Sequence, residues 1–526
     1  MSPPATARHS ITVAAWTLVS RLTGLGRVLV LGAVLGPTFF ANAAQSGLLL
    51  PSLVYTIIAG PLVAMVVIPT VVRVISDRTT VHAADVLGRI SGFMLLVAAC
   101  LTVALVGVSS LVARALTFGV PDGMSERAKA LAVLLVLVVA PQIVLYVVAA
   151  IGVAAQQARN RFALAAAAPA VENLGVIATV LVAGHVFDTG LEVDTVPVGF
   201  VLVLGLGATA AVLVHAGLQV YGAARAGLAL RPRGGWRSDP EARGAVRRLR
   251  RSVGVAAFPS LGLFAMLTVA GTLPGGVLVL QISLAAFSTL SYLGPRAVSM
   301  AVMPLLSNIS SRADETGYAA AWRTGLFYAA TASCPFLVLL VVFAGPTAEL
   351  LAYGKADQAL IVAQLAACLA VVAVAQLAGG AHDIGRQALF ARLDEHGPLM
   401  ASTAALATTL AVSAAALLLS DGTVRLVGLT AAILLAEVVA ASVVLVRMRS
   451  AIRPEPVVDL RQIGVLLLGA VAIIPVALAG RWLLAAFDAG RLATVAMLAA
   501  IGLLAVAAYA GAIKFGNARL LSGEGR

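Results

Sequence analysis

Long apolar runs dominate the sequence and constrain its fold more than any other feature. Reading them between polar or Gly/Pro interruptions gives about fourteen segments, each about 20 residues or longer. A helix that crosses the ~30 Å of bilayer hydrocarbon needs about 20 apolar residues. We therefore predict an all-α integral membrane protein with about fourteen transmembrane helices. The predicted spans are residues 11–36, 40–72, 89–118, 131–155, 162–184, 196–224, 251–272, 275–304, 323–345, 357–380, 397–420, 424–446, 462–485 and 490–513.

The composition excludes a water-soluble protein. Hydrophobic residues make up 61% of the 526 residues and charged residues only 11%, whereas soluble domains carry about a quarter charged residues. The net charge of +13 does not indicate nucleic-acid binding, because the basic residues form short clusters with little aromatic interleaving. Cys100, Cys334 and Cys368 lie in apolar runs without metal-ligand spacing, and the sequence has no nucleotide-binding motif. We therefore expect no nucleic-acid partner, no metal and no cofactor, and a transporter in place of an enzyme.

The longest polar link separates the sixth and seventh spans and is rich in arginine. Because cytoplasmic loops concentrate Lys and Arg, this link predicts a cytoplasmic location, and the even number of spans on either side places both termini there too. With that assignment, 26 of the 36 Lys and Arg residues fall in cytoplasmic segments and seven in external loops. Arg21, Arg27 and Arg296 remain within spans. The arginines of the link are Arg225, Arg231, Arg233, Arg237, Arg243, Arg247, Arg248, Arg250 and Arg251.

A weak internal repeat indicates how the spans are organised. The junction after the fourth span reads GVAAQQARNRFALAAAAP (152–169), and the junction six spans later reads GRQALFARLDEHGPL (385–399). Both contain a Gln and an Ala-Arg pair before a short polar link and a proline. Transporters are often built from such repeats. We predict a six-helix half (1–224), a basic linker (225–250), a second six-helix half (251–450) and two C-terminal helices (451–526).

Five short motifs follow one another along these spans. Residues 20–27 read SRLTGLGR, 50–53 LPSL, 160–163 NRFA, 304–307 PLLS and 391–394 ARLD. Their order and spacing, from about residue 10 to 450, resemble those of the MurJ/MviN family of lipid-linked cell-wall precursor flippases. That family lies in the multidrug/oligosaccharidyl-lipid/polysaccharide exporter superfamily.

The resemblance implies a function that composition and periodicity do not. It implies a flippase that moves an undecaprenyl-pyrophosphate-linked precursor to the outer leaflet by alternating access, through a cationic cavity between two halves. The implied location is the bacterial inner membrane, and the implied partners are a lipid-linked glycan and membrane lipids. Transport would be driven by a monovalent ion or the membrane potential, and the last two helices would form a groove for the lipid tail. We also expect a monomer.

Two arginines, Arg21 and Arg27, lie inside the first span. An arginine near the bilayer centre costs about 2.5–3.5 kcal/mol, so it is expected to face a wet cavity or a partner. Its planar fork also suits a pyrophosphate, to which it can donate paired hydrogen bonds. The two residues are roughly 120° off a shared helix face, so a bend at Gly24 and Gly26 would direct both at one ligand. The alternative is that one of them snorkels to the cytoplasmic interface.

Other polar residues within spans are further candidates. Glu172, beside Asn173, is a candidate coupling carboxylate for a proton or cation, or a partner for the arginines; the alternative is a protonated carboxyl bonded to a neighbouring helix. Arg296 follows a proline, where a broken helix would direct its guanidinium at the cavity, or bond it to a freed backbone carbonyl. His215 and Glu437 are interpreted mainly as interhelical contacts.

Three positions depart from the family pattern. Val28 stands where an aspartate is usual, and Tyr55 and Ala285 stand where the family has cavity arginines. We expect Arg296 and the Tyr55 hydroxyl to compensate for them in part, and Asn173 to be a further substrate contact. The missing charges leave four functions open: a flippase for peptidoglycan lipid II, a flippase for another lipid-linked polysaccharide unit, a transport-deficient homologue, and a drug/cation antiporter of the same superfamily.

Overall fold

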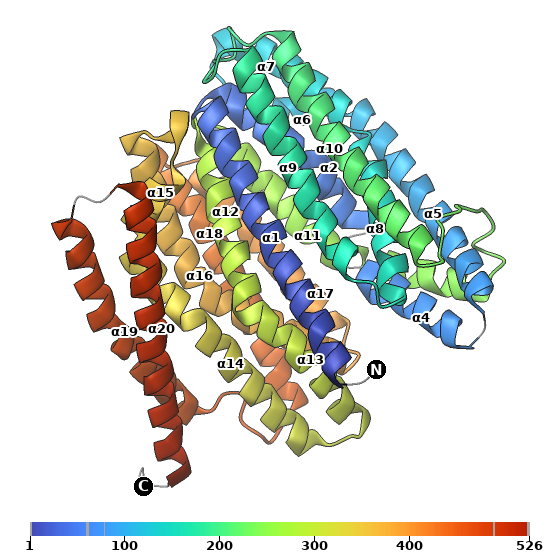
Figure 1. Ribbon diagram of the computed structural model, residues 1–526, viewed down its shortest axis with the longest axis vertical. Coiled ribbons are helices and arrows are strands. Elements are labelled where there is room, and N and C mark those ends of the chain that lie inside the picture. Colours follow the sequence, from blue (N-terminus) through green and yellow to red (C-terminus); the bar gives the residue numbers. More distant parts are fainter. Residues whose placement is uncertain (1–2, 59–62, 78, 488–489, 523–526) are drawn as a thin grey trace. The chain divides into compact units, whose positions relative to one another are not determined.

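The described part of the chain is entirely helical. The computed structural model describes residues 3–58, 63–77, 79–487 and 490–522, and these form helices and loops without a strand (Figure 1). A bilayer offers no hydrogen bonds to the backbone, so an apolar segment satisfies its N–H and C=O groups internally by forming a helix. The predicted all-α membrane fold is confirmed.

Residues 1–278 together with 354–356 form the first of two compact units. Helix α12 (Gly276–Leu293) begins in this unit and continues in the second. Its elements are α1 (Pro3–Leu35), α2 (Phe39–Ile58), the π-helix η1 (Val63–Val67), α4 (Ile68–Asp77), α5 (Thr80–Gly107), α6 (Ser109–Leu116), α7 (Asp122–Val139), α8 (Gln142–Ala158), α9 (Ala163–Val186), α10 (Val198–Arg225), α11 (Pro240–Ala270), α12 (Gly276–Leu293) and the short 3₁₀ turn η2 (Gly354–Ala356).

Residues 279–353 and 357–526 form the second unit. Its remaining helices are α13 (Pro295–Ser311), α14 (Glu315–Val342), α15 (Ala344–Leu351), α16 (Ala359–Ala391), α17 (His396–Ala416), α18 (Gly422–Ala451), α19 (Leu460–Ala486) and α20 (Arg491–Ser522). The boundaries of the predicted six-helix halves, linker and C-terminal extension stay a prediction.

Thirteen of the fourteen predicted spans fall on one helix or on two consecutive helices, and the described residues of the span 40–72 fall on α2, η1 and α4. Among the described residues, twelve helical segments are long and apolar enough to cross a membrane. The two predicted spans outside this set are 40–72 and 251–272. The first contains residues 59–62, which lie outside the described residues, and the apolar part of the second is the shorter stretch Ala256–Ala270. The protein is thus a multi-pass membrane protein, and the count of fourteen is approximate.

Glycines bring the helices of the first unit close together. α1 lies beside α9, and α10 packs against both α8 and α9 (Figure 1). A Cβ on Gly152 of α8 would lie 2.7 Å from the Gln219 carbonyl oxygen of α10, so this crossing has no room for a side chain. Close backbone approach of this kind is typical of helix packing in membranes.

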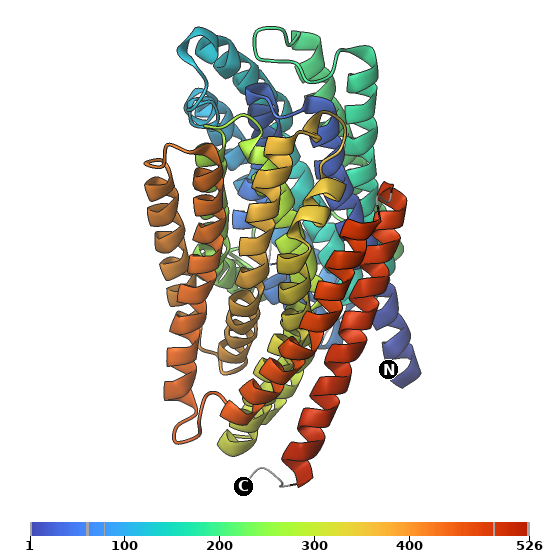
Figure 2. The same cartoon turned by 90° about the vertical axis from the view of Figure 1, so that its left-hand side faces the viewer.

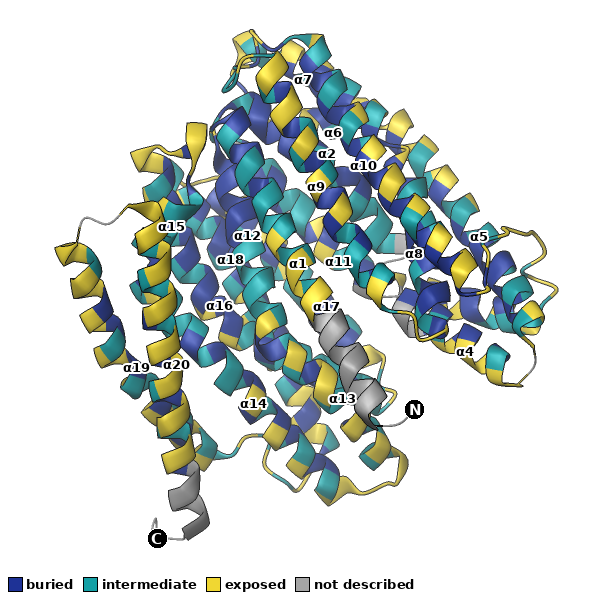
Figure 3. Cartoon of the chain, viewed as in Figure 1, coloured by how far each residue is buried: buried dark blue, intermediate teal, exposed yellow. Residues whose placement is uncertain are grey.

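Helix α16 occupies the centre of the second unit, where α13, α14 and α18 pack against it. The last two helices, α19 and α20, run side by side, and α19 also packs against α14 (Figure 2). Their outward faces are exposed, as Figure 3 shows, and carry large apolar side chains. Leu467 is 61% exposed and Leu503 73% exposed, which suits helices surrounded by hydrocarbon.

The turn between α16 and α17 is fixed by Asp394. Its Oδ1 accepts hydrogen bonds from the backbone N–H groups of His396 and Gly397, both at 3.0 Å. Its Oδ2 accepts from Nε of Arg447 on α18 at 2.8 Å. Burial alone would raise the pKa of Asp394, but these donors outweigh it and lower the pKa below its ordinary value.

Replacing Asp394 with Asn removes the charge that these donors stabilise, so we expect a loss of about 1 kcal/mol of stability at pH 7. A carboxylate whose folded-state pKa is lowered contributes stability above its unfolded pKa of about 3.9 and loses it as the pH falls below that. The difference between wild type and Asp394→Asn in thermal unfolding in detergent is therefore expected to shrink from pH 7 to pH 4. The exposed Glu395, whose side chain does not cap α17, gives the control Glu395→Gln.

Candidate functional site

The first unit contains an open cavity of about 520 Å³ that is lined by residues of α1, α2, η1, α4, α8, α9 and α10. Five of the predicted site residues line it, from three of these helices. They are joined by Tyr146 and by His215, which sequence reasoning had interpreted mainly as a packing contact. The polar residues of the lining are Arg21, Arg27, Ser52, Tyr55, Thr56, Tyr146, Gln157, Glu172, Asn173 and His215.

Helix α1 carries both arginines to the cavity without a break. The sequence suggested a bend at Gly24 and Gly26, but α1 is continuous from Pro3 to Leu35. The two glycines instead face α9: a Cβ on Gly24 would lie 3.4 Å from Nδ2 of Asn173. That nitrogen donates to the backbone oxygen of Ser20 at 3.1 Å and to Oγ1 of Thr23 at 3.3 Å. The expected bend was wrong because the long arginine side chains reach the same cavity from an intact helix.

Glu172 lies at the centre of a hydrogen-bonded network. Its Oε1 accepts from the Tyr146 hydroxyl at 2.7 Å, and its Oε2 is 2.6 Å from Nδ1 of His215. An Nη1 atom of Arg27 lies 4.0 Å from Oε1. The Glu172 side chain is only 9% exposed. A buried charge needs such partners, because burial without them costs several kcal/mol.

The network continues through two glutamines and favours one form of His215. Nε2 of Gln156 donates to Oε1 of Gln219 at 2.6 Å, which leaves Nε2 of Gln219 to face Nε2 of His215 at 3.3 Å. A ring nitrogen that accepts a hydrogen bond carries no proton. The donor and acceptor pattern thus places the proton of a neutral His215 on Nδ1, directed at Glu172.

The cavity lining carries an excess of positive charge. Of its residues, Arg21 and Arg27 are cationic and Glu172 is the one acid, and the network described above already holds that carboxylate. Tyr55 adds an aromatic wall, since its ring centroid is 5.5 Å from that of Tyr146. Val28 is buried and does not line the cavity. This arrangement suits an anion with a few polar groups, such as a phosphate ester.

The remaining predicted candidate, Arg296, belongs to the second unit. The helix breaks there as expected: α12 ends at Leu293, and α13 begins at Pro295. The Arg296 guanidinium lies over the ring of Tyr292, at 4.6 Å from its centroid. The first-unit cavity therefore brings together five of the six predicted site residues, and the structure describes Arg296 in the other unit.

Sequence reasoning missed a polar cluster on α16. The tenth span was predicted to end at residue 380, but α16 continues to Ala391. Within this added length, Arg386 donates from Nη2 to Oδ1 of Asp383 at 2.6 Å. His382 places Nδ1 at 2.8 Å from Oε2 of Glu437 on α18. The polar residues within 382–386 led to a predicted end of the span, although the helix continues there with an apolar, buried face.

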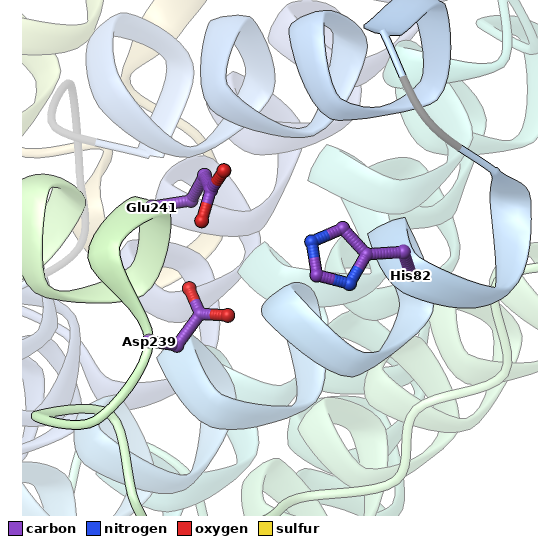
Figure 4. Close-up of side chains that lie close together, drawn as sticks. All are labelled: His82, Asp239 and Glu241. Carbon is purple, nitrogen blue, oxygen red and sulfur yellow. The ribbon is translucent and has the colours of Figure 1, made fainter.

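Three side chains at the start of α5 and α11 converge as metal ligands do. His82, Asp239 and Glu241 point toward one another in Figure 4, and their ligand atoms lie within 4.8 Å of one another. Ligands about 2.1 Å from one metal ion are at most about 4.2 Å apart, so the group would have to contract to hold an ion. Asp239 also caps α11, since its Oδ1 accepts from the Ala242 N–H at 2.8 Å. We assign the group a structural role at this helix start.

The two tyrosines of the cavity make a matched pair for testing the network. Tyr146→Phe removes a donor from buried Glu172, so we expect a loss of about 1–3 kcal/mol in thermal stability. Among the described residues, the Tyr55 hydroxyl has no hydrogen-bond partner, so Tyr55→Phe is expected to change stability by less than about 0.5 kcal/mol. Unfolding of both variants in detergent measures the difference. Equal losses would contradict the assigned network.

The comparisons with solved structures agree on the fold. The chain matches the structure "Lipid II flippase MurJ, inward closed conformation" with a TM-score of 0.73 and 14% identity, over 95% of this chain and 98% of that one. It also matches an inward-facing multidrug resistance MATE family transporter of the MOP superfamily, with a TM-score of 0.63 and 14% identity over 85% and 99% of the two chains. A Vibrio cholerae MATE transporter matches with a TM-score of 0.54 and 17% identity over 86% and 98%.

The family comparison covers most of the sequence. The family model described as "Lipid II flippase MurJ" matches residues 31–502, a range that covers most of both units and most of the cavity lining. Arg21 and Arg27 precede this range, so their place in the site rests on the geometry of α1. The chain is therefore a member of the MurJ lipid II flippase family.

Proposed function

We propose that this protein flips a polyprenyl-pyrophosphate-linked cell-wall precursor, peptidoglycan lipid II or a closely related lipid-linked glycan, from the inner to the outer leaflet. The observation that carries the proposal is the cationic cavity of the first unit, where two intramembrane arginines face an open volume. Family membership supports the substrate class. The fold shared with MOP-superfamily transporters supports alternating access as the mechanism.

The pyrophosphate is assigned to Arg21 and Arg27. Each guanidinium presents a planar fork that donates two parallel hydrogen bonds to phosphate oxygens. Tyr55 and Asn173 line the same cavity and supply polar groups for the glycan end. Arg296 is proposed as a further substrate contact, because it is an intramembrane cation beside a helix break.

The orientation proposed for the chain follows its charge distribution. The arginine-rich link before and along the start of α11 is placed in the cytoplasm, which puts both termini there as well. The membrane is proposed to be the bacterial inner membrane, and the protein is proposed to act as a monomer.

The arginine assignment is tested by substrate binding. Purified Arg21→Ala/Arg27→Ala protein is expected to bind a polyprenyl-pyrophosphate glycan at least 100-fold more weakly than wild type, because each charge-assisted contact contributes about 1.5–3 kcal/mol. Binding is measured by titration with the purified lipid-linked glycan. The control is Arg225→Ala/Arg231→Ala, which removes the same charge from exposed positions outside the cavity.

Two results would contradict this proposal. Binding retained in the double variant, with the control unchanged, would remove Arg21 and Arg27 from the site. Cation efflux that depends on Glu172, without any binding of the lipid, would favour a drug/cation antiporter. Depletion of the protein in cells, followed by analysis of the accumulated lipid-linked intermediate, identifies the glycan and separates lipid II from another polysaccharide unit.

Glu172 is proposed as the residue that couples transport to a proton or a monovalent cation. It is the one acid in the cavity lining, and it lies within reach of a substrate-binding arginine and a histidine. A proton on this carboxyl would weaken its attraction for Arg27 and leave that guanidinium available to pyrophosphate. Loading of the ion and loading of the substrate would then favour each other.

Glu172→Gln removes the ionisable group and keeps the shape of the side chain. In proteoliposomes, we expect flipping by wild type to respond to an imposed pH or sodium gradient and flipping by the variant not to respond. Binding of the lipid-linked glycan is expected to be equal or tighter, because Arg27 loses its acidic neighbour. Glu437→Gln on α18 is the matched control. A gradient response that survives in Glu172→Gln would exclude the carboxylate as the coupling group.

A further inference from the structure

A second cationic pocket lies at the start of α11, apart from the transport cavity lining. It has a volume of about 460 Å³ and is lined by Trp236, Arg243, Val246, Arg247 and Arg250. None of these five residues is acidic. Among the described residues, no ion pair or hydrogen bond joins the three guanidinium groups to another side chain. The pocket therefore presents three positive charges to its contents.

The three arginines share one face of α11. Positions 243, 247 and 250 have the i, i+4, i+7 spacing that places side chains along one stripe of a helix. The opposite stripe, Ala242, Ala245 and Leu249, is at most 4% exposed and packs into the apolar core of the first unit. The guanidinium groups thus point away from the packed side. Arg248, off this stripe, donates instead to Oγ1 of Thr70 at 3.0 Å.

Trp236 forms the aromatic side of the pocket and is fixed in place. Its ring stacks edge to face on Phe93 of α5, with centroids 5.1 Å apart, and it packs against the same core. The Arg237 guanidinium lies 5.0 Å from the Trp236 ring centroid, which adds another cation beside the pocket. A tryptophan with one packed and one wet face is typical of the membrane–water interface.

The same stripe of α11 becomes apolar toward the membrane. Leu261 lies eleven residues after Arg250, which is about 20° around the helix and about 16 Å along it. It is 48% exposed, and Val253, between them, is 37% exposed. A ligand on this face would meet three guanidinium groups at one end and open apolar surface at the other. That order of charge and apolar surface matches the phosphate and acyl chains of a phospholipid.

We propose that the pocket of Trp236, Arg243, Val246, Arg247 and Arg250 binds the phosphate headgroup of an anionic phospholipid, whose acyl chain follows Val253 and Leu261. Two or three guanidinium forks would hold the phosphate by charge-assisted hydrogen bonds. The bound lipid would anchor the basic linker to the headgroup layer and stabilise the first unit. This site is separate from Arg21 and Arg27 and does not depend on the proposed transport function.

Binding is tested with the full-length protein in detergent. The protein is titrated with phosphatidylglycerol or with phosphatidylcholine that has the same acyl chains. Native mass spectrometry counts the lipids bound at each lipid concentration. Wild type is expected to retain one phosphatidylglycerol at least tenfold more tightly than phosphatidylcholine. Arg243→Gln/Arg247→Gln/Arg250→Gln is expected to lose that preference. The control Arg159→Gln/Arg225→Gln/Arg231→Gln removes equal charge from exposed arginines outside the pocket and is expected to keep it.

A further variant controls for misfolding, and a competing ligand distinguishes a phospholipid from a free phosphate compound. Arg243→Lys/Arg247→Lys/Arg250→Lys keeps the charge but loses the planar forks, so it is expected to fold and to bind phosphatidylglycerol more weakly than wild type. Phosphatidylglycerol is expected to raise the melting temperature of wild type and the control but not of the Gln variant. Inorganic pyrophosphate that displaces the lipid at micromolar concentration would assign the pocket to a free phosphate compound and overturn the lipid proposal.

Equal loss of phosphatidylglycerol in the Gln variant and its control would also overturn the proposal, because it would show attraction by overall charge alone. Arg21→Ala/Arg27→Ala distinguishes this site from the transport cavity. That variant is expected to keep the phosphatidylglycerol preference even though it loses the lipid-linked glycan. Failure of the α11 proposal therefore leaves the transport proposal intact, and the reverse holds as well.

Discussion

The structure of the first unit depends on holding charge inside a membrane. A guanidinium or carboxylate in hydrocarbon is stable only beside a partner, a wet cavity or both. Here α1 supplies Arg27, α8 Tyr146, α9 Glu172 and α10 His215, so four helices must meet for the charges to be satisfied. Glycines make that meeting geometrically feasible, since Gly24 and Gly152 allow α1 to approach α9 and α8 to approach α10. The packing and the polar site therefore specify each other.

The sequence predicted much of this because the bilayer reduces folding to a few rules. Apolar runs of about 20 residues identified the spans, and the arginine-rich link gave a topology. Arg21, Arg27, Tyr55, Glu172 and Asn173 were predicted separately and line one cavity. What could not be predicted was the pairing between helices. Nothing in the sequence around Tyr146, or around His215, marks them as partners of Glu172, because hydrogen bonds across helices leave no local pattern.

Two wrong expectations have a common physical origin. The bend expected at Gly24 and Gly26 treated glycine as a source of flexibility, whereas these glycines make room for α9. The early end assigned to the tenth span treated Asp383 and Arg386 as a loop, whereas they pair on the surface of α16. In the first case α9 accommodates glycines that would weaken an isolated helix. In the second, Asp383 also accepts a hydrogen bond from the Ser299 hydroxyl of α13, and only the tertiary structure shows either neighbour.

The glutamine pair behind His215 has a consequence for energy conservation. A proton that enters from the cavity can reach Glu172, beside which Nδ1 of a neutral His215 already carries a proton. It can go no further, because Gln219 and Gln156 continue the chain of hydrogen bonds with amide groups, which donate and accept but do not pass protons on. The hydrogen-bond network therefore ends at the two glutamines and provides no path for a proton beyond His215.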